Sequence, residues 1–145
     1  KSRMATTVTF VNVSPQRVYE AILDVDMISR FMFGPLLREE EILHIENDPQ
    51  VGGEFSYKVR RSKDEIDHVG RFLELDPPKR IAFTWAIAPE KDGSTVSIDI
   101  APTKGGCTVT LMHEMAPEWA DFLDRSHAAW EKMLGVLATL LQPSP

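Results

Sequence analysis

The sequence contains a single cysteine, Cys107, among its 145 residues. One thiol cannot form an internal disulfide, and a lone free cysteine is typical of a reducing compartment. The first residues, Lys1-Ser2-Arg3-Met4, lead directly into alternating residues and do not form the pattern of a secretory signal peptide. These absences predict a cytoplasmic protein.

Long apolar runs are missing as well. A membrane-spanning helix needs about 18 or more consecutive apolar residues, and no segment reaches that length, so we expect no stable membrane insertion. Acidic residues outnumber basic residues by 22 to 16, which gives a formal net charge of −6. An acidic chain without a Lys/Arg cluster is not expected to bind nucleic acid or anionic membrane surfaces.

Recognisable catalytic and cofactor motifs are also absent. The sequence has no Gly-rich phosphate loop, nucleophile elbow or paired-acid motif. Its four histidines, His44, His68, His113 and His127, lack the short spacings of a zinc or iron site. We therefore predict no metal site, no cofactor and no catalytic residue.

The composition that remains is that of a folded protein. Hydrophobic residues make up 43% of the chain and charged residues 26%, a balance found in globular rather than disordered proteins. The length suits one ordinary domain, and no linker, repeat or low-complexity tract divides it. We predict one domain over residues 1–145.

Turn-forming residues divide the chain into short elements. A strand at 8–11 is followed by two short helices, the first capped by Ser14 before Pro15 and the second capped by Asp26 and ended by Gly34-Pro35. Short connections between the later strands predict an antiparallel meander, which brings the total to about seven strands. Those strands are expected at 38–46, 54–61, 67–76, 80–88, 94–101 and 107–114.

The last segment predicts one long helix centred on Trp130, from Ala116-Pro117 to Pro143. A helix of roughly 24 residues would be about 36 Å long, and it can bury an apolar stripe only if a sheet curves around it. We predict an α+β fold with a curved antiparallel sheet around this helix. The stripe consists of Trp119, Phe122, Leu123, Ser126, Trp130, Met133, Leu134, Leu137, Leu140 and Leu141.

Period-two alternation assigns an inner face to each strand, and short turns set the register between neighbours. A two-residue turn at Pro77-Pro78 fixes one hairpin, and the same logic applies to the next. Glycine opposite a tryptophan would leave room for the indole ring. The predicted pairs are Asp76–Lys79, Glu74–Ile81, Phe72–Phe83, Gly70–Trp85, Ile100–Val109, Ile98–Leu111 and Val96–His113.

In element order and motifs the sequence resembles the family of activator of heat-shock-protein-90 ATPase homologues, part of the START-like (SRPBCC) superfamily with the birch-pollen-allergen helix-grip fold. The likeness covers almost the whole chain and rests on Val51-Gly52-Gly53-Glu54-Phe55, on residues 70–85 and on Ala129-Trp130-Glu131-Lys132-Met133-Leu134. The chain departs from many relatives at Phe31-Met32-Phe33-Gly34-Pro35, a region that helps to close the cavity mouth in this fold. The resemblance implies a cavity between helix and sheet and supplies no catalytic motif.

Aromatic side chains on the expected inner face are the main candidates for ligand contacts. They would either line a pocket for a flat or lipid-like molecule or fill the core of a small domain. The candidate ligand-binding residues are Phe55, Tyr57, Phe72, Phe83, Trp85, Leu111, His113, Trp119, Phe122, Trp130 and Met133.

Polar residues near this face are also considered as functional groups. His113 could bind a ligand or act as an acid or base, or it could be held by neighbouring groups within the core. An inward Glu74 would need a partner, for which a rim ion pair with Arg80 or Lys58 is expected. The acidic run Glu39-Glu40-Glu41 is expected on a solvated strand edge or as a docking patch.

We therefore predict non-catalytic binding of a small hydrophobic molecule, aromatic or lipid-like, between the C-terminal helix and the sheet. The alternative implied by the resemblance is a chaperone-accessory or stress-response role with a chaperone partner. A cyclase- or hydrolase-like enzyme is less favoured, because only His113, Glu74 and Tyr57 could supply an acid/base pair. Both a monomer and a homodimer are compatible with the sequence.

Overall fold

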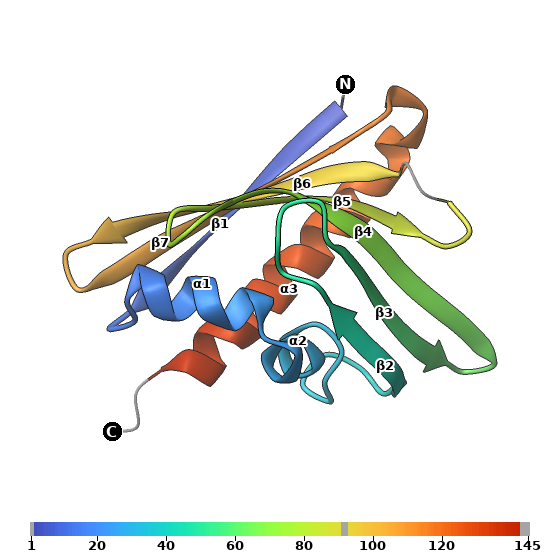
Figure 1. Cartoon of the computed structure of the whole chain (residues 1–145), viewed down its shortest axis with the longest axis horizontal. Coiled ribbons are helices and arrows are strands. Elements are labelled where there is room, and N and C mark those ends of the chain that lie inside the picture. The colour runs from blue at the N-terminus through green and yellow to red at the C-terminus, as the bar shows by residue number, and fades with distance from the viewer. Residues whose placement is uncertain (1, 91–92, 143–145) are drawn as a thin grey trace.

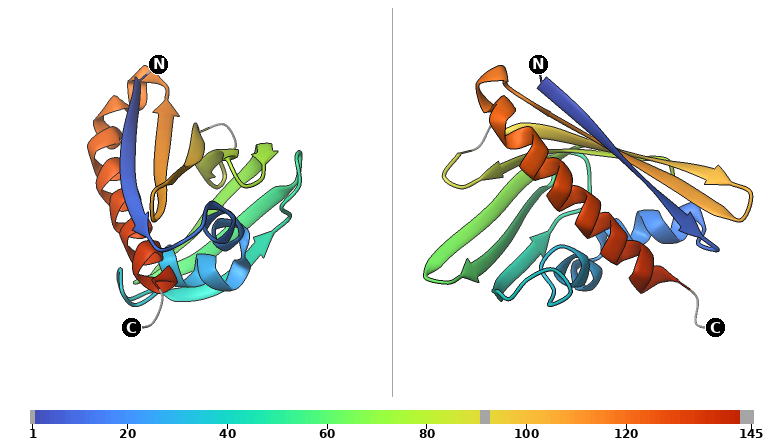
Figure 2. Two further views of the ribbon diagram at one scale, coloured as in Figure 1. Left: turned by 90° about the vertical axis from the view of Figure 1, so that its left-hand side faces the viewer. Right: turned by 180° about the vertical axis from the view of Figure 1, so that it is seen from behind.

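The computed structural model of the chain describes residues 2–90 and 93–142. Seven antiparallel strands form one sheet in the order β1-β7-β6-β5-β4-β3-β2. The sheet is strongly curved, and the long helix α3 runs diagonally across it (Figures 1 and 2). The strands are β1 (Ser2–Val11), β2 (Glu41–Asn47), β3 (Glu54–Arg61), β4 (Asp64–Asp76), β5 (Arg80–Ile87), β6 (Ser94–Thr103) and β7 (Gly106–Met115). The predicted α+β fold class is confirmed.

Two short helices follow β1, as predicted. In α1 (Pro15–Leu23) the Ser14 side chain accepts a hydrogen bond from the Arg17 backbone N–H at 3.2 Å. The cap of α2 (Val25–Phe31) is Asp24, and the prediction of Asp26 is wrong. Asp24 ends α1 and its carboxylate accepts from the Met27 N–H at 2.9 Å, so one residue both separates and caps the two helices.

The turns explain where the predicted strand bounds fail. Residues 38–40 precede β2, which begins only at Glu41 rather than at 38. The turn between β3 and β4 contains just Ser62 and Lys63, with Ser62 at a positive φ of 57°, so β4 starts three residues earlier than expected. β1 starts at Ser2, well before the predicted residue 8, and it pairs with β7 along its length.

The register of the β4–β5 hairpin corrects part of the prediction. Asp76 pairs with Arg80 and Glu74 with Ala82, so the predicted partners Lys79 and Ile81 are wrong. The connection is one residue longer than assumed, and an irregularity between Phe72 and Glu74 compensates for it. The pair Phe72–Phe83 is therefore confirmed.

Gly70 lies opposite Trp85 in the register that Val69–Ala86 and Phe72–Phe83 define, as predicted, but the ring for which it leaves room is that of Phe55. It pairs with Phe55 on β3, and a Cβ at Gly70 would collide with the Phe55 ring and the Thr84 carbonyl oxygen. In the next hairpin the predicted pairs are confirmed: Ile100–Val109, Ile98–Leu111 and Val96–His113.

The predicted long helix consists of two segments. A 3₁₀ helix, η1 (Pro117–Phe122), precedes α3 (Leu123–Leu141), whose 19 residues span about 28 Å. A 3₁₀ helix has three residues per turn, so Trp119 and Phe122 depart from the stripe that α3 continues. Their side chains are 46% and 42% exposed, and their predicted place on the buried face is wrong. The buried stripe consists of Trp130, Met133, Leu134, Leu137 and Leu141.

Within residues 2–90 and 93–142, every helix is too short or too polar to cross a membrane.

Candidate ligand-binding cavity

The aromatic residues of the inner sheet face close the core around a very small void. Phe55 lies 4.7 Å from Tyr57 and 5.6 Å from Phe83, measured between ring centroids. Together with Phe72 they surround a volume of ≈ 10 Å³, about the space of one water molecule. Leu111 is fully buried in the same core. These five predicted ligand-binding residues fill the interior and leave no space for a ligand among themselves.

A larger cavity of ≈ 280 Å³ lies between α3, the β4–β5 part of the sheet and the segment after α2. Its apolar lining includes Phe33, Trp85, Phe122, Ala129, Trp130 and Met133. Four of these six belong to the predicted set: Trp85, Phe122, Trp130 and Met133. Trp119 is not part of the lining, but its ring lies 5.6 Å from that of Phe122.

Aromatic rings form one continuous wall of this cavity. The Phe33 ring lies 5.0 Å from the His68 ring, His68 lies 5.4 Å from Trp85, and Trp85 lies 5.1 Å from Trp130. The three pairs are tilted at 35–60°, an arrangement that aromatic pairs favour over face-to-face stacking. Sheet, helix and the segment after α2 therefore each contribute rings to one surface.

His113 lies behind this wall and is fully occupied by internal hydrogen bonds. Trp130 Nε1–H donates to His113 Nδ1 at 3.1 Å, so the ring proton sits on Nε2, which donates to Ser94 Oγ at 2.6 Å. Ser94 in turn donates to the Trp85 carbonyl oxygen at 2.9 Å. The network ties α3 to three strands and fixes the orientation of Trp130.

Burial lowers the pKa of His113 to about 4, so the ring is neutral near pH 7. Its neighbours hold His113 as a core residue, which is one of the two alternatives that the sequence left open.

His68 is the buried imidazole that does reach the cavity. Its Nδ1–H donates to the Tyr57 carbonyl oxygen at 2.9 Å, which leaves Nε2 as a hydrogen-bond acceptor. Burial lowers its pKa, and the hydrogen bond to Tyr57 partly offsets this effect. The neutral ring thus offers one acceptor within an otherwise aromatic wall.

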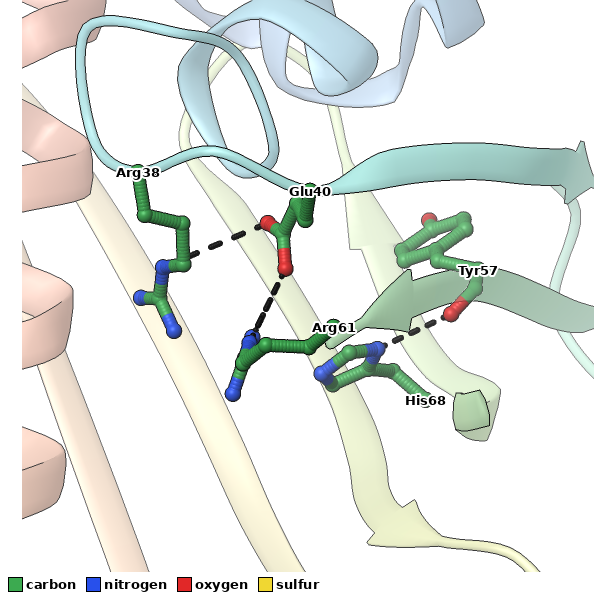
Figure 3. Close-up of polar contacts among 5 residues, drawn as sticks. All are labelled: Arg38, Glu40, Tyr57, Arg61 and His68. Atoms are coloured by element: carbon green, nitrogen blue, oxygen red, sulfur yellow. Dashed lines mark hydrogen bonds and ion pairs between the residues drawn. The ribbon is translucent and has the colours of Figure 1, made fainter. Parts of the chain in front are cut away.

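An ion-paired glutamate, Glu40, faces two arginines of the cavity lining, Arg38 and Arg61 (Figure 3). The Glu40 side chain is fully buried, and its Oε2 accepts from Arg61 Nε at 3.1 Å and Nη2 at 2.9 Å. Arg38 Nε lies 4.0 Å from Glu40 Oε1. The expectation of a solvated edge for the whole acidic run is wrong at Glu40, whose side chain is fully buried just before β2 begins, whereas Glu39 and Glu41 are exposed.

The three residues considered for acid/base chemistry each have another structural role. Glu74 lies at the rim and pairs with Arg80 at 3.1 Å, as predicted. The Tyr57 hydroxyl donates to Asn47 Oδ1 at 2.7 Å, and burial raises its pKa. With His113 bound to Trp130 and Ser94, no two of the three are hydrogen-bonded to each other.

Sequence reasoning missed the three arginines of the cavity lining, Arg38, Arg61 and Arg125. Arg61 ends strand β3, in which Tyr57 and Val59 point inward. The same alternation places Arg61 on the inner face, so the sequence did contain a signal for its position. Arg38 lies in an irregular segment without periodicity, and Arg125 lies next to the apolar stripe of α3. Neither position carries a pattern that marks it as part of a site.

The curved sheet that holds a C-terminal helix over a cavity defines a START-like helix-grip protein. The family model described as Activator of Hsp90 ATPase homolog 1-like protein matches residues 12–142. The chain therefore belongs to this family, and the predicted resemblance is confirmed.

Solved structures share this fold at low sequence identity. Protein CV1439 from Chromobacterium violaceum is 24% identical with a TM-score of 0.80, over 99% of this chain and 100% of that chain. An AHSA1-like protein from Aeromonas hydrophila is 18% identical with a TM-score of 0.78, over 99% and 98%. The Aha1 dimer from Colwellia psychrerythraea is 17% identical with a TM-score of 0.75, over 97% and 96%. No curated protein sequence gives a significant match.

Proposed function

We propose that this protein binds a small hydrophobic molecule, aromatic or lipid-like, in the cavity between α3 and the sheet, without converting it chemically. The observation that carries the proposal is a cavity of ≈ 280 Å³ with a continuous aromatic wall. This volume is near the lower end of small-molecule sites, which span roughly 300–1,000 Å³. A compact ligand of two or three rings, or a short acyl chain, suits it best.

The lining favours flat or flexible apolar groups. Trp85 and Trp130 offer ring faces, and Met133 adds a flexible thioether that adapts to different shapes. His68 Nε2 supplies one acceptor that would orient a ligand hydroxyl or amine. A few polar groups in an apolar cavity are the usual arrangement of a binding site.

The experiment is a titration with N-phenyl-1-naphthylamine, a neutral aromatic probe, followed by its own fluorescence. A panel of lipids and polyphenols then competes for the site. The wild-type protein should bind the probe with a single saturable phase. Ala129→Phe places a ring in the cavity, because Ala129 lines it, and should weaken binding by roughly tenfold or more.

Ala128→Phe is the matched control. Ala128 is the neighbouring residue of α3 and is exposed, so its new ring extends into solvent. It should leave probe affinity within about twofold. Equal effects of the two variants, or no saturable binding by the wild type, would contradict the proposed site.

A chaperone-accessory or stress-response role is the second candidate. The family description favours it, and so does the exposed apolar pair Trp119 and Phe122, which a partner protein could cover. The assay is stimulation of a heat-shock-protein-90 ATPase by the purified chain. Stimulation that Trp119→Ser abolishes would support this role, and no stimulation by the wild type would count against it.

We also propose a cytoplasmic location. The buried thiol of Cys107, whose pKa is raised by burial, is compatible with a reducing compartment. Fractionation of the native host should recover the protein with cytoplasmic markers.

A further inference from the structure

The polar part of the cavity lining is positively charged. Arg38, Arg61 and Arg125 line it, and among the described residues no carboxylate does. The chain as a whole carries a formal charge of −6, so the positive charge of the three arginines at this cavity is opposite in sign to the net charge of the protein. Adding the adjacent Glu40 still leaves a local formal charge of +2, from three cations and one anion.

Most of the guanidinium N–H groups of these three arginines make no hydrogen bond to another described residue. Arg61 uses Nε and Nη2 for Glu40, which leaves Nη1 for another acceptor. Arg38 lies too far from Glu40 Oε1, at 4.0 Å, for a hydrogen bond. Arg125 contacts the Phe122 ring, with its guanidinium carbon 5.4 Å from the ring centroid. These groups are therefore available to an anion that enters the cavity.

Glu40 lies between Arg38 and Arg61 but does not use all of their hydrogen-bond donors. Figure 3 shows Arg38 facing Oε1 and Arg61 facing Oε2 of the carboxylate, with the His68 ring beside Arg61. Oε1 of Glu40 is buried and has no hydrogen-bond partner among residues 2–90 and 93–142. The side chains of Arg38 and Arg61 are 36% and 37% exposed, so both lie where the cavity opens to solvent.

We propose that the cavity selects amphipathic anions, in which an aromatic or aliphatic body carries a carboxylate, sulfonate or phosphate group. The apolar body lies against Trp85 and Trp130, and the acidic group binds Arg38 and Arg61, with Arg125 closing the site from α3. Guanidinium groups suit this task because their planar fork matches the geometry of an oxyanion. The inference rests on the proposed function and adds the chemical class of the ligand.

The test compares two probes with the same aromatic skeleton. 8-Anilinonaphthalene-1-sulfonate differs from N-phenyl-1-naphthylamine by one sulfonate group. The anionic probe should bind at least about fivefold more tightly, a ratio of the size expected from partly exposed ion pairs. Its affinity should fall between roughly 0.01 M and 1 M ionic strength, over which the Debye length drops from about 30 to about 3 Å. The affinity of the neutral probe should not fall.

Four variants assign the effect to residues. Arg38→Gln and Arg125→Gln should each weaken the anionic probe by roughly two- to fivefold more than they weaken the neutral probe. Glu40→Gln should tighten the anionic probe by a similar factor, because it removes the competing carboxylate. Arg60→Gln is the matched control. Arg60 precedes Arg61 in β3 and pairs with Glu41 and Glu65 outside the cavity.

The outcomes separate the two proposals. If both probes bind with equal affinity, or if Arg60→Gln matters as much as Arg38→Gln, the preference for anions is overturned and the hydrophobic site stands. If neither probe binds, the proposed function fails and takes this inference with it. Tighter binding of the anion that depends on Arg38, Arg125 and salt supports the inference.

Discussion

Among single residues, His113 shows how an imidazole becomes part of an apolar core. Both ring nitrogens have partners, Trp130 on one side and Ser94 on the other, and the side chain is 2% exposed. In a charged ring Nδ1 carries a proton and is itself a donor, so it could no longer accept the hydrogen bond from Trp130 Nε1–H. Protonation and this network therefore exclude each other.

The first prediction concerns pH. The pKa of His113 is about 4 in the folded protein and about 6.5 when unfolded. Between these values the unfolded chain binds the proton and the folded protein does not, so stability falls as pH falls from about 6.5 to about 4. The loss should approach about 3 kcal/mol. Urea unfolding at pH 7 and at pH 4.5 measures it.

His113→Gln is the control for this prediction, because it removes the titrating group at the same position. Burial also lowers the pKa of His68, which acts in the same direction in both proteins and cancels in the comparison. The variant should lose less stability on acidification than the wild type. An identical loss in both would show that His113 does not titrate in this range.

The second prediction concerns the Glu40–Arg61 pair. Arg61→Gln leaves a buried carboxylate without its two strongest donors and should lower the free energy of unfolding by about 1–3 kcal/mol. Glu40→Gln/Arg61→Gln should recover part of that loss, because a neutral amide costs less to bury. Chemical unfolding checks both variants. Arg60→Gln should have a smaller effect, and a larger one would contradict this role for Arg61.

Individual roles were the hardest part to predict from the sequence. Alternation assigned the inner faces, and turn lengths set the pairs: Val96–His113 followed directly, whereas Phe72–Phe83 was correct because an irregularity offsets the longer turn. It could not show that His113 is held by Trp130, since that contact joins residues of two distant elements. Glu40 looked like one of three equivalent surface acids, because its burial depends on an irregular segment.

Among the elements, the hairpin β3–β4 depends on close backbone contact at Gly70. The third prediction is that Gly70→Ala lowers the free energy of unfolding by at least about 2 kcal/mol, because its Cβ meets the Phe55 ring and the Thr84 backbone. Gly135→Ala is the contrast: it lies within α3 with no atom near its added Cβ, and it should stabilise by about 0.5–1 kcal/mol. Thermal unfolding of both variants checks the pair, and equal effects would contradict the packing.

Element type was easier to predict from the sequence than element bounds. Periodicity identified all seven strands and the apolar stripe of α3, because burial of a face imposes the pattern. The switch from η1 to α3 at Leu123 left no such pattern, since a spacing of three residues fits both kinds of helix locally. The extra residue of the β4–β5 turn was likewise hidden by the irregularity that restores the register.

For the whole molecule, the family resemblance predicted a cavity between the C-terminal helix and the sheet, but the sequence could not show which of the inner residues line it. The inner aromatic residues seemed equivalent, but Phe55, Phe72 and Phe83 close the core whereas Trp85 and Trp130 face the open side. The difference arises from the curvature of the sheet and from the segment after α2, which brings Phe33 over His68. Such volumes depend on the sum of many side chains rather than on a local pattern.

The fourth prediction follows from mass action. A ligand at about 100 times its Kd stabilises the folded state by about 2.7 kcal/mol, which for a chain of this size raises Tm by roughly 5–10 °C. N-Phenyl-1-naphthylamine should give this shift with the wild type and with Ala128→Phe. Differential scanning calorimetry of Ala129→Phe should show little shift, and an undiminished shift would contradict binding in the cavity.

The most direct measurement is a crystal structure of the protein with 8-anilinonaphthalene-1-sulfonate. The account predicts electron density for the rings against Trp85 and Trp130, with the sulfonate within hydrogen-bond distance of Arg38 or Arg61. Density for the probe only outside the cavity, for example on the exposed Trp119 surface, would contradict it.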